Sequence, residues 1–208
     1  MLTIAVFGSG RGSNFEAILT AMNGGTIPGA RIACVISNNS SAGILELAVH
    51  YSLPAYHLSQ KHFGTEELFV DRMLAILRGH EVNLIALAGY MKLLPPVVVA
   101  QYRNRIINIH PALLPKFGGK GMYGHHVHEA VLAAGERESG ATVHMVDEIF
   151  DHGTIVLQKA VPVLPDDTPD SLQARILQVE HEIYPEAIRR LARGEVPTPA
   201  NAAAAMSS

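Results

Sequence analysis

The sequence is poor in the residues that mark several classes of protein. Its 208 residues include no tryptophan and a single cysteine, Cys34, which excludes an internal disulfide framework and a multi-cysteine metal site. Charged residues make up 17% of the chain, and 16 Lys and Arg stand against 19 Asp and Glu. No Lys/Arg run occurs, so neither a nucleic-acid partner nor a membrane partner is expected. No apolar run reaches the roughly 18 residues of a membrane-spanning segment.

The chain has enough apolar sequence for a folded core. Hydrophobic residues make up 48%, an ordinary value for a globular protein. At roughly 150 residues per domain, we expect a single domain over residues 1–195 and a flexible C-terminal tail over residues 196–208. The tail expectation rests on the low-complexity sequence PTPANAAAAMSS. The N-terminus, MLTIAVFGSG, lacks the basic segment of a secretory signal, and we expect a cytoplasmic protein.

Apolar periodicity predicts strands that alternate with helices. This alternation is typical of an α/β layered fold with a mostly parallel central sheet. The last two expected strands have no helical segment between them, so an antiparallel edge is expected toward the C-terminus. The strands are expected over residues 2–7, 31–37, 54–58, 82–88, 105–109, 141–146 and 154–163, and the helices over 13–22, 42–50, 65–78, 126–134 and 168–193.

A glycine-rich segment, GSGRGSN over residues 8–14, links the first strand to the first helix. Glycines let the backbone approach a ligand closely, and the free N–H groups of a helix N-terminus bind anions. The dinucleotide fingerprint GxGxxG requires glycine where this chain has Ser13, and residues 34–38 lack the expected carboxylate. A single phosphate therefore fits better than a dinucleotide. The alternative is a tight turn capped by Ser13.

The segment NIHPALLP, residues 108–115, follows an expected strand. Alternation places Asn108 and His110 on one side of that strand. An amide can polarise a carbonyl and an imidazole can give or take a proton, so the pair suits acyl-group chemistry. A lone histidine in such a place is more often a hydrogen-bonded structural residue.

The segment DEIFDHG, residues 147–153, offers carboxylates before a glycine. Such a segment alone usually marks a turn. In a functional interpretation one carboxylate faces His110, because a nearby negative charge raises the pKa of an imidazole and makes it a usable acid near neutral pH.

Two further segments leave their function open. His125, His126 and His128 lie close together. The pair with helical spacing, His125 and His128, has neither an obvious third ligand nor the glutamate of an HExxH motif, so no metal is expected. The glycine-rich loop over residues 118–124 fits a substrate lid and a plain surface loop equally well.

Taken together, these segments resemble the phosphoribosylglycinamide formyltransferases, a family of folate-dependent formyltransferases of purine biosynthesis. The resemblance covers about residues 1–195 and rests on the order of five motifs. They are GSGRGSN at 8–14, AGYMKLL at 88–94, NIHPALLPKF at 108–117, the turn holding Asp151, and EHEIYP at 180–185. It implies a three-layer, Rossmann-like formyltransferase fold. It also implies transfer of a formyl group from the co-substrate 10-formyltetrahydrofolate to the amine of glycinamide ribonucleotide, without a metal, by a monomer or homodimer.

The resemblance also implies a role for each matching residue. Asn108 would contact the formyl oxygen, His110 would be the general acid, and Asp151 would keep it charged. The remaining residues would bind the two substrates: Gly12, Ser13 and Asn14 the phosphate, Glu180 the glycinamide end of the ribonucleotide, and Met91, Lys92, Leu93, Leu94 and Asn108 the folate. The family often has an arginine for the folate at about residues 64–68, where this chain has none; Lys61, Arg72 or another group could replace it.

Other functions compete with this one. A formyltetrahydrofolate hydrolase would use the same three catalytic residues with water as acceptor, but relatives of that type carry an extra N-terminal domain. A methionyl-tRNA formyltransferase would need a tRNA-binding domain and a basic surface. An NAD-dependent oxidoreductase would need the missing glycine and carboxylate, and a noncatalytic nucleotide-binding module would leave Asn108, His110 and Asp151 without a purpose.

Overall fold

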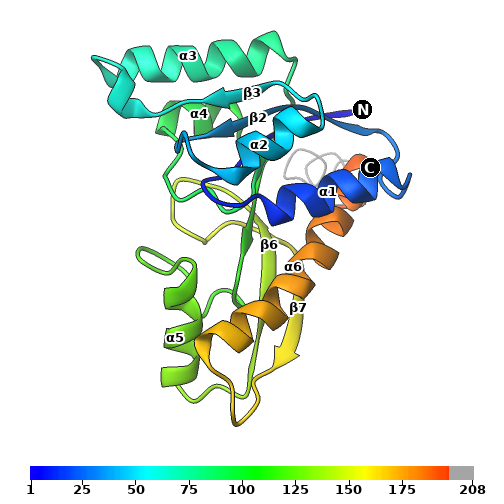
Figure 1. Cartoon of the computed structure of the whole chain (residues 1–208), viewed down its shortest axis with the longest axis vertical. Coiled ribbons are helices and arrows are strands. Elements are labelled where there is room, and N and C mark those ends of the chain that lie inside the picture. Colours follow the sequence, from blue (N-terminus) through cyan, green and yellow to red (C-terminus); the bar gives the residue numbers. More distant parts are fainter. Residues whose placement is uncertain (197–208) are drawn as a thin grey trace, which may run out of the picture.

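A computed structural model describes residues 1–196 of the chain (Figure 1). Strands and helices alternate along most of it, as the periodicity predicts. The strands are β1 (Leu2–Phe7), β2 (Ala30–Ser37), β3 (Ala55–His57), β4 (Leu84–Leu87), β5 (Ile106–His110), β6 (Glu138–Met145) and β7 (Ile155–Pro162). The helices are α1 (Ser13–Asn23), α2 (Gly43–His50), the 3₁₀ helix η1 (Gln60–His62), α3 (Glu66–Gly79), α4 (Pro96–Gln101), α5 (His125–Ala133) and α6 (Pro169–Ala192).

All the strands join one sheet in the order β3-β2-β1-β4-β5-β6-β7. The first five are parallel, β6 is antiparallel to β5, and β7 is antiparallel to β6. This confirms the mostly parallel sheet with an antiparallel edge toward the C-terminus. The strand order reverses between β1 and β4, and in open α/β sheets ligands bind beyond the carboxyl ends of the strands at such a switch point.

Helices cover both faces of the sheet, so the molecule has three layers. On one face, α1, α2, α5 and α6 contribute to one apolar cluster, for example through Phe15, Ile44 and Tyr184. On the other face, α3 and α4 contribute Met73 and Val98 to a second cluster. Figure 1 shows α6 running beside α1 along the first of these faces. The three-layer, Rossmann-like expectation is confirmed.

Several boundaries differ from the expected ones for physical reasons. Helix α4 was not expected: it has only six residues, too few for a periodic pattern, and it begins with Pro96 at its first turn. Strand β6 begins at Glu138, three residues early, although Ser139 and Gly140 have little strand propensity. Glycine is required there because a Cβ at Gly140 would overlap the carbonyl oxygen of Lys159 on β7.

Helix α6 forms as the sequence predicts. Thr168 is its N-cap and accepts a hydrogen bond from the backbone N–H of Ser171 at 3.2 Å. Gly194, with φ 68°, follows the last turn, and its N–H donates to the Leu191 carbonyl at 3.1 Å. The expected tail lies, from residue 197 on, outside the described residues, and the single domain over 1–195 stays a prediction.

Candidate active site

A cleft of about 790 Å³ lies beyond the carboxyl ends of β1, β4 and β5. Its walls come from segments far apart in the chain: the loop after β4, the end of β5, the loops before α5 and after β6, and one face of α6. Of the site residues that the sequence suggests, the cleft is lined by Asn14, Met91, Lys92, Leu93, Leu94, Asn108, His110, Asp151 and Glu180.

The three proposed catalytic residues meet in this cleft. Asn108 and His110 lie on the same side of β5, two residues apart. Asp151 enters from the loop between β6 and β7, and its Oδ2 lies 3.7 Å from Nδ1 of His110. Asp151 has φ 52°, a left-handed conformation that is uncommon for a residue other than glycine. The amide, imidazole and carboxylate therefore converge although Asn108 and Asp151 are 43 positions apart in the chain.

His144, which the sequence analysis missed, joins these residues into one network. It faces Asn108 across the antiparallel pair β5–β6. Its Nδ1 donates to the Met145 carbonyl at 2.8 Å, so in the neutral ring Nε2 accepts from Nδ2 of Asn108 at 3.2 Å. The same Nε2 lies 3.5 Å from Oδ1 of Asp151. One amide hydrogen of Asn108 is thus used for orientation, and the other is available for a ligand.

Burial sets the proton affinity of the central pair. His110 is 3% exposed, and this burial lowers its pKa; the charge of Asp151 and the hydrogen bond to the Phe117 carbonyl raise it, but only in part. The expectation of a raised pKa was therefore wrong, because the depth of the site cannot be read from the motif. Burial alone would raise the pKa of Asp151, but the neighbouring His144 ring, the charge of His110 and the hydrogen bond from the Gly119 N–H lower it overall.

The glycine-rich segment forms the N-terminus of α1. Gly12 is the N-cap with φ 89°, and no side chain caps the helix, so the alternative of a turn capped by Ser13 is wrong. A Cβ at Gly12 would lie 2.9 Å from the Ile44 backbone, so glycine is needed for the close approach of α2. Asn14 lines the large cleft, whereas Gly12 and Ser13 are not among its lining residues, and Ser13 lines a second hollow instead.

Asn14 and Glu180 form a buried polar contact in the wall of the cleft. The Nδ2 of Asn14 donates to Oε2 of Glu180 at 2.7 Å. Burial raises the pKa of Glu180 to about 7, and the hydrogen bond from Asn14 lowers it only in part. Within residues 1–196, Oδ1 of Asn14 is buried without a hydrogen-bond partner. An amide oxygen without a partner can accept a hydrogen bond from a hydroxyl or amine group of a ligand.

The mouth of the cleft is apolar and partly exposed. Leu94 is buried, but Met91 and Leu93 are 50% and 67% exposed, and Ile149 and Phe150 lie exposed on the loop that carries Asp151. Such a surface suits a flat aromatic ligand. The expected replacements for a folate-binding arginine, Lys61 and Arg72, do not line the cleft; its lining cations are Lys92 and Lys120.

The comparisons with known proteins agree with this geometry. The family model described as formyl transferase matches residues 2–188. The chain belongs to the formyl transferase family. As a member of that family it shares 42% identity, over 90% of its length, with a chloroplastic phosphoribosylglycinamide formyltransferase of Vigna unguiculata, and it spans 60% of that relative. It is 40% identical to the phosphoribosylglycinamide formyltransferase of Haemophilus influenzae, with 94% of this chain and 90% of the relative covered.

Solved structures show the same formyl transferase fold. The glycinamide ribonucleotide transformylase 1 of Symbiobacterium toebii superposes with a TM-score of 0.87 at 41% identity, over 93% of this chain and 89% of that one. A formyltetrahydrofolate deformylase of Pseudomonas syringae superposes with a TM-score of 0.84 at 24% identity, over 95% of this chain and 63% of that one. The second likeness concerns the fold alone. Among the curated relatives, the chain spans less than two thirds of the length of the two plant proteins, 60% and 63%.

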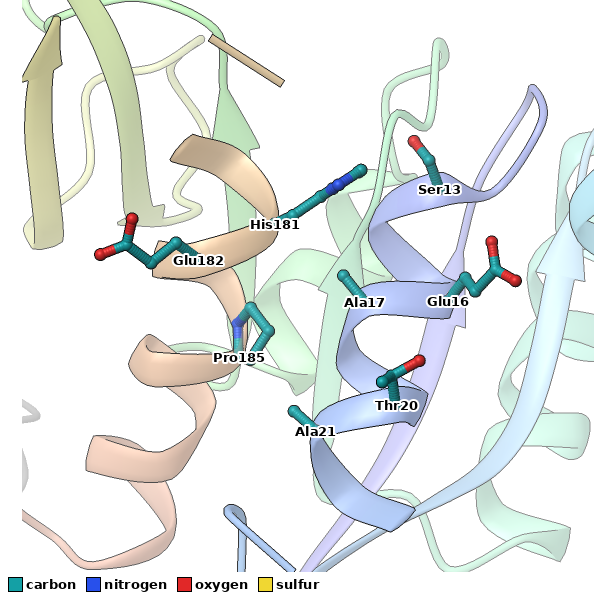
Figure 2. A pocket seen from close by; sticks show the side chains of 8 residues that line it. All are labelled: Ser13, Glu16, Ala17, Thr20, Ala21, His181, Glu182 and Pro185. Atoms are coloured by element: carbon teal, nitrogen blue, oxygen red, sulfur yellow. The ribbon is translucent and has the colours of Figure 1, made fainter. Parts of the chain in front are cut away.

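This formyl transferase has a second hollow, a groove of about 480 Å³ between α1 and α6 (Figure 2). It is lined by Ser13, Ala17 and Ala21 on α1 and by Pro185 on α6, and the His181 side chain points from α6 toward the first turn of α1. None of the three catalytic candidates lines this groove, whereas all three line the larger cleft.

The histidines of α5 have different surroundings. His125 and His126 pair with Glu129 at 3.6 and 3.2 Å, and His128 is buried in the cleft wall. Nowhere in residues 1–196 are three or more His, Cys, Asp or Glu side chains grouped so that they could hold a metal ion. No helix in the same range has the length and hydropathy to cross a membrane.

Proposed function

We propose that this chain transfers a formyl group from 10-formyltetrahydrofolate to the amine of glycinamide ribonucleotide. The observation that carries the proposal is the meeting of Asn108, His110 and Asp151 in one cleft, in a chain of the formyl transferase family. Relatives that bear the name phosphoribosylglycinamide formyltransferase cover nearly the whole chain.

The cleft, together with the α1 N-terminus whose Asn14 lines it, offers a place for each substrate. The ribonucleotide would lie with its phosphate at the α1 N-terminus, where Gly12, Ser13 and Asn14 present backbone N–H groups, and Glu180 would contact its glycinamide end. The formyl-folate would lie between the apolar residues of the mouth, against Met91, Lys92, Leu93 and Leu94.

The reaction needs a carbonyl to be polarised and a proton to be moved. The amine attacks the formyl carbon and gives a tetrahedral intermediate with a negative oxygen. The free amide hydrogen of Asn108 and the imidazolium of His110 would stabilise this oxygen, and His110 would protonate the leaving folate nitrogen. Asp151 favours the charged ring, because its carboxylate lies beside Nδ1. The chemistry requires no metal or redox cofactor.

One experiment separates transfer from hydrolysis. The protein is supplied with 10-formyltetrahydrofolate, with and without glycinamide ribonucleotide, and folate deformylation is followed. Turnover that requires the ribonucleotide supports the proposal. Equal turnover in its absence would instead identify a formyltetrahydrofolate hydrolase. Such an enzyme would use the same three residues with water as the acceptor.

A further inference from the structure

The backbone of Phe117, Gly118 and Gly119 contacts both members of the His110–Asp151 pair. The Phe117 carbonyl accepts a hydrogen bond from Nε2 of His110 at 2.8 Å. The Gly119 N–H donates to Oδ2 of Asp151 at 2.9 Å. Between them, a Cβ at Gly118 would lie 3.1 Å from Cβ of Asp151 and 2.7 Å from a methyl group of Leu114. Glycine at position 118 thus allows the segment to lie directly against the catalytic carboxylate.

The bond to Phe117 determines where the protons of His110 lie. A carbonyl oxygen only accepts, so Nε2 carries a hydrogen whenever this bond is formed. In the neutral ring the lone pair is then on Nδ1. A second proton must add at Nδ1, which lies 3.7 Å from Oδ2 of Asp151 and faces the carboxylate. The nitrogen that titrates is therefore Nδ1.

The carbonyl of Phe117 is held in place by an unusual backbone. Phe117 has φ 55°, a left-handed conformation that disfavours residues other than glycine. Its side chain packs against the larger apolar cluster, which stabilises the residue in this conformation. Non-glycine residues in such conformations persist where the surrounding structure fixes them, and they concentrate at functional sites.

We propose that the Phe117 carbonyl is a positioning group that makes Nδ1 of His110 the nitrogen that delivers the proton of the reaction. This rests on the proposed formyl transfer. As the bond between the formyl carbon and the folate nitrogen breaks, its electron pair takes the proton from Nδ1. The amine nitrogen, which has formed the new C–N bond, releases one proton, and this proton returns to Nδ1 through Asp151 or water. No net proton is gained or lost.

The tautomer of His110 is measured first, on the substrate-free protein. Histidine is labelled with ¹⁵N, and the His110 signals are assigned by their loss in His110→Gln. We expect a neutral ring protonated at Nε2, with a large ¹⁵N shift at Nδ1 as the pH is lowered. A neutral ring protonated at Nδ1 overturns the proposal. This readout needs no turnover, so it stands apart from the test of formyl transfer: a protein without transferase activity but with the expected tautomer refutes the proposed function only.

Ligand binding shows whether the Phe117 carbonyl stays bound to His110 during the reaction or is displaced by the substrate. With saturating glycinamide ribonucleotide the Nε2–H signal is expected to stay in place. If the ribonucleotide shifts it to the value of a free imidazole N–H, the carbonyl covers His110 only in the empty site, and the proposal is wrong.

Two substitutions at one position complete the test. Phe117→Gly keeps the carbonyl and accepts the left-handed φ, whereas Phe117→Val disfavours that φ because of its branched Cβ. We expect Phe117→Val to lower kcat at least tenfold, with unchanged KM and a mixed His110 tautomer, while Phe117→Gly keeps the Nε2–H tautomer and the larger part of kcat. Equal losses in both variants, in step with their thermal stability, would show a merely structural role. If Phe117→Val does not fold, the tautomer and ribonucleotide measurements still decide.

Discussion

Asn14 and Glu180, 166 residues apart in the chain, meet side chain to side chain, with Nδ2 of Asn14 2.7 Å from Oε2 of Glu180. The contact joins the first turn of α1 to α6 at the wall of the cleft. Both residues are buried, at 7% and 8% exposure. Burying a carboxyl group in such a place costs stability, a cost that proteins accept where the group is kept for function.

Glu180→Gln is expected to stabilise the protein at alkaline pH and to weaken ribonucleotide binding. The pKa of Glu180 rises from 4.5 to about 7 in the folded protein. The folded state therefore favours the neutral carboxyl, and stability is lost as the pH rises from 4.5 through 7. Glutamine cannot ionise, so the free energy of unfolding should increase by up to about 3 kcal/mol at pH 8 and change little at pH 4. Urea unfolding at the two pH values measures this.

Glu182→Gln is the control for Glu180→Gln, because Glu182 is exposed on the same helix and pairs with Lys159 at the surface. Its effect should stay below about 1 kcal/mol. The same gain in both variants at pH 8 would refute the burial argument. KM for the ribonucleotide should rise only in Glu180→Gln.

His128 is expected to weaken the fold in acid. Burial, with the charges of His125 and His110 as further causes, lowers its pKa from 6.5 to about 4. The neutral form is favoured in the folded state, so stability is lost as the pH falls from 6.5 to 4, by up to about 3 kcal/mol. Because Nδ1 of His128 has no partner among residues 1–196, His128→Leu sacrifices no hydrogen bond at that atom.

The measurement for His128 is the free energy of unfolding between pH 4 and 7. His128→Leu should reduce the decline in acid, whereas His126→Leu, at an exposed position on the same helix, should leave it unchanged. A decline that is identical in all three proteins would assign acid sensitivity to other groups.

The fold was largely predictable because its signals are local. Alternating apolar runs predict the strands, and Thr168 and Gly194 mark the ends of α6. Helix α4 and the first residues of β6 were not predictable, because a six-residue helix has too few turns for periodicity and Gly140 is selected by a contact with the neighbouring strand.

The site was predictable only where its residues are neighbours in the chain. Asn108 and His110 share a strand face at a spacing of two, but only the family resemblance singled out Asp151 among the carboxylates of residues 147–153. His144 gave no signal of its own, because it acts through a cross-strand pair with Asn108. The lowered pKa of His110 depends on burial by distant segments, and no local pattern reports burial.

Removal of His110 should abolish transfer without unfolding the protein. Loss of a general acid typically lowers the rate by about 10²–10⁴-fold. In His110→Ala, formyl transfer and thermal unfolding are measured on the same preparation. A variant with near-normal turnover contradicts the role of His110, and the exposed His126→Ala serves as control.

Asp151→Asn should shift the pH profile of kcat downward. The charge of Asp151 raises the pKa of His110 against the effect of burial. Without the Asp151 charge, His110 loses its proton at a lower pH, so activity begins to fall at a lower pH as the pH is raised. The profile is measured from pH 5 to 9. An unchanged midpoint would mean that Asp151 does not act through His110.

Gly140→Ala should strongly destabilise the sheet edge next to the site. A Cβ at this position would overlap the Lys159 carbonyl and lie 2.7 Å from a methyl group of Leu113 and 3.0 Å from the Ala160 backbone. Backbone atoms cannot move aside without opening the β6–β7 ladder, so a loss of about 3 kcal/mol is expected, at the upper end for overpacking.

Gly64→Ala is the control, because a Cβ there meets nothing within 4 Å, and it should be neutral or slightly stabilising. Urea midpoints compare the two variants, and equal values would mean that the β6–β7 pair accommodates a methyl group. Because His144 lies on β6 opposite Asn108, Gly140→Ala should also lower kcat more than Gly64→Ala does at a temperature where both are folded.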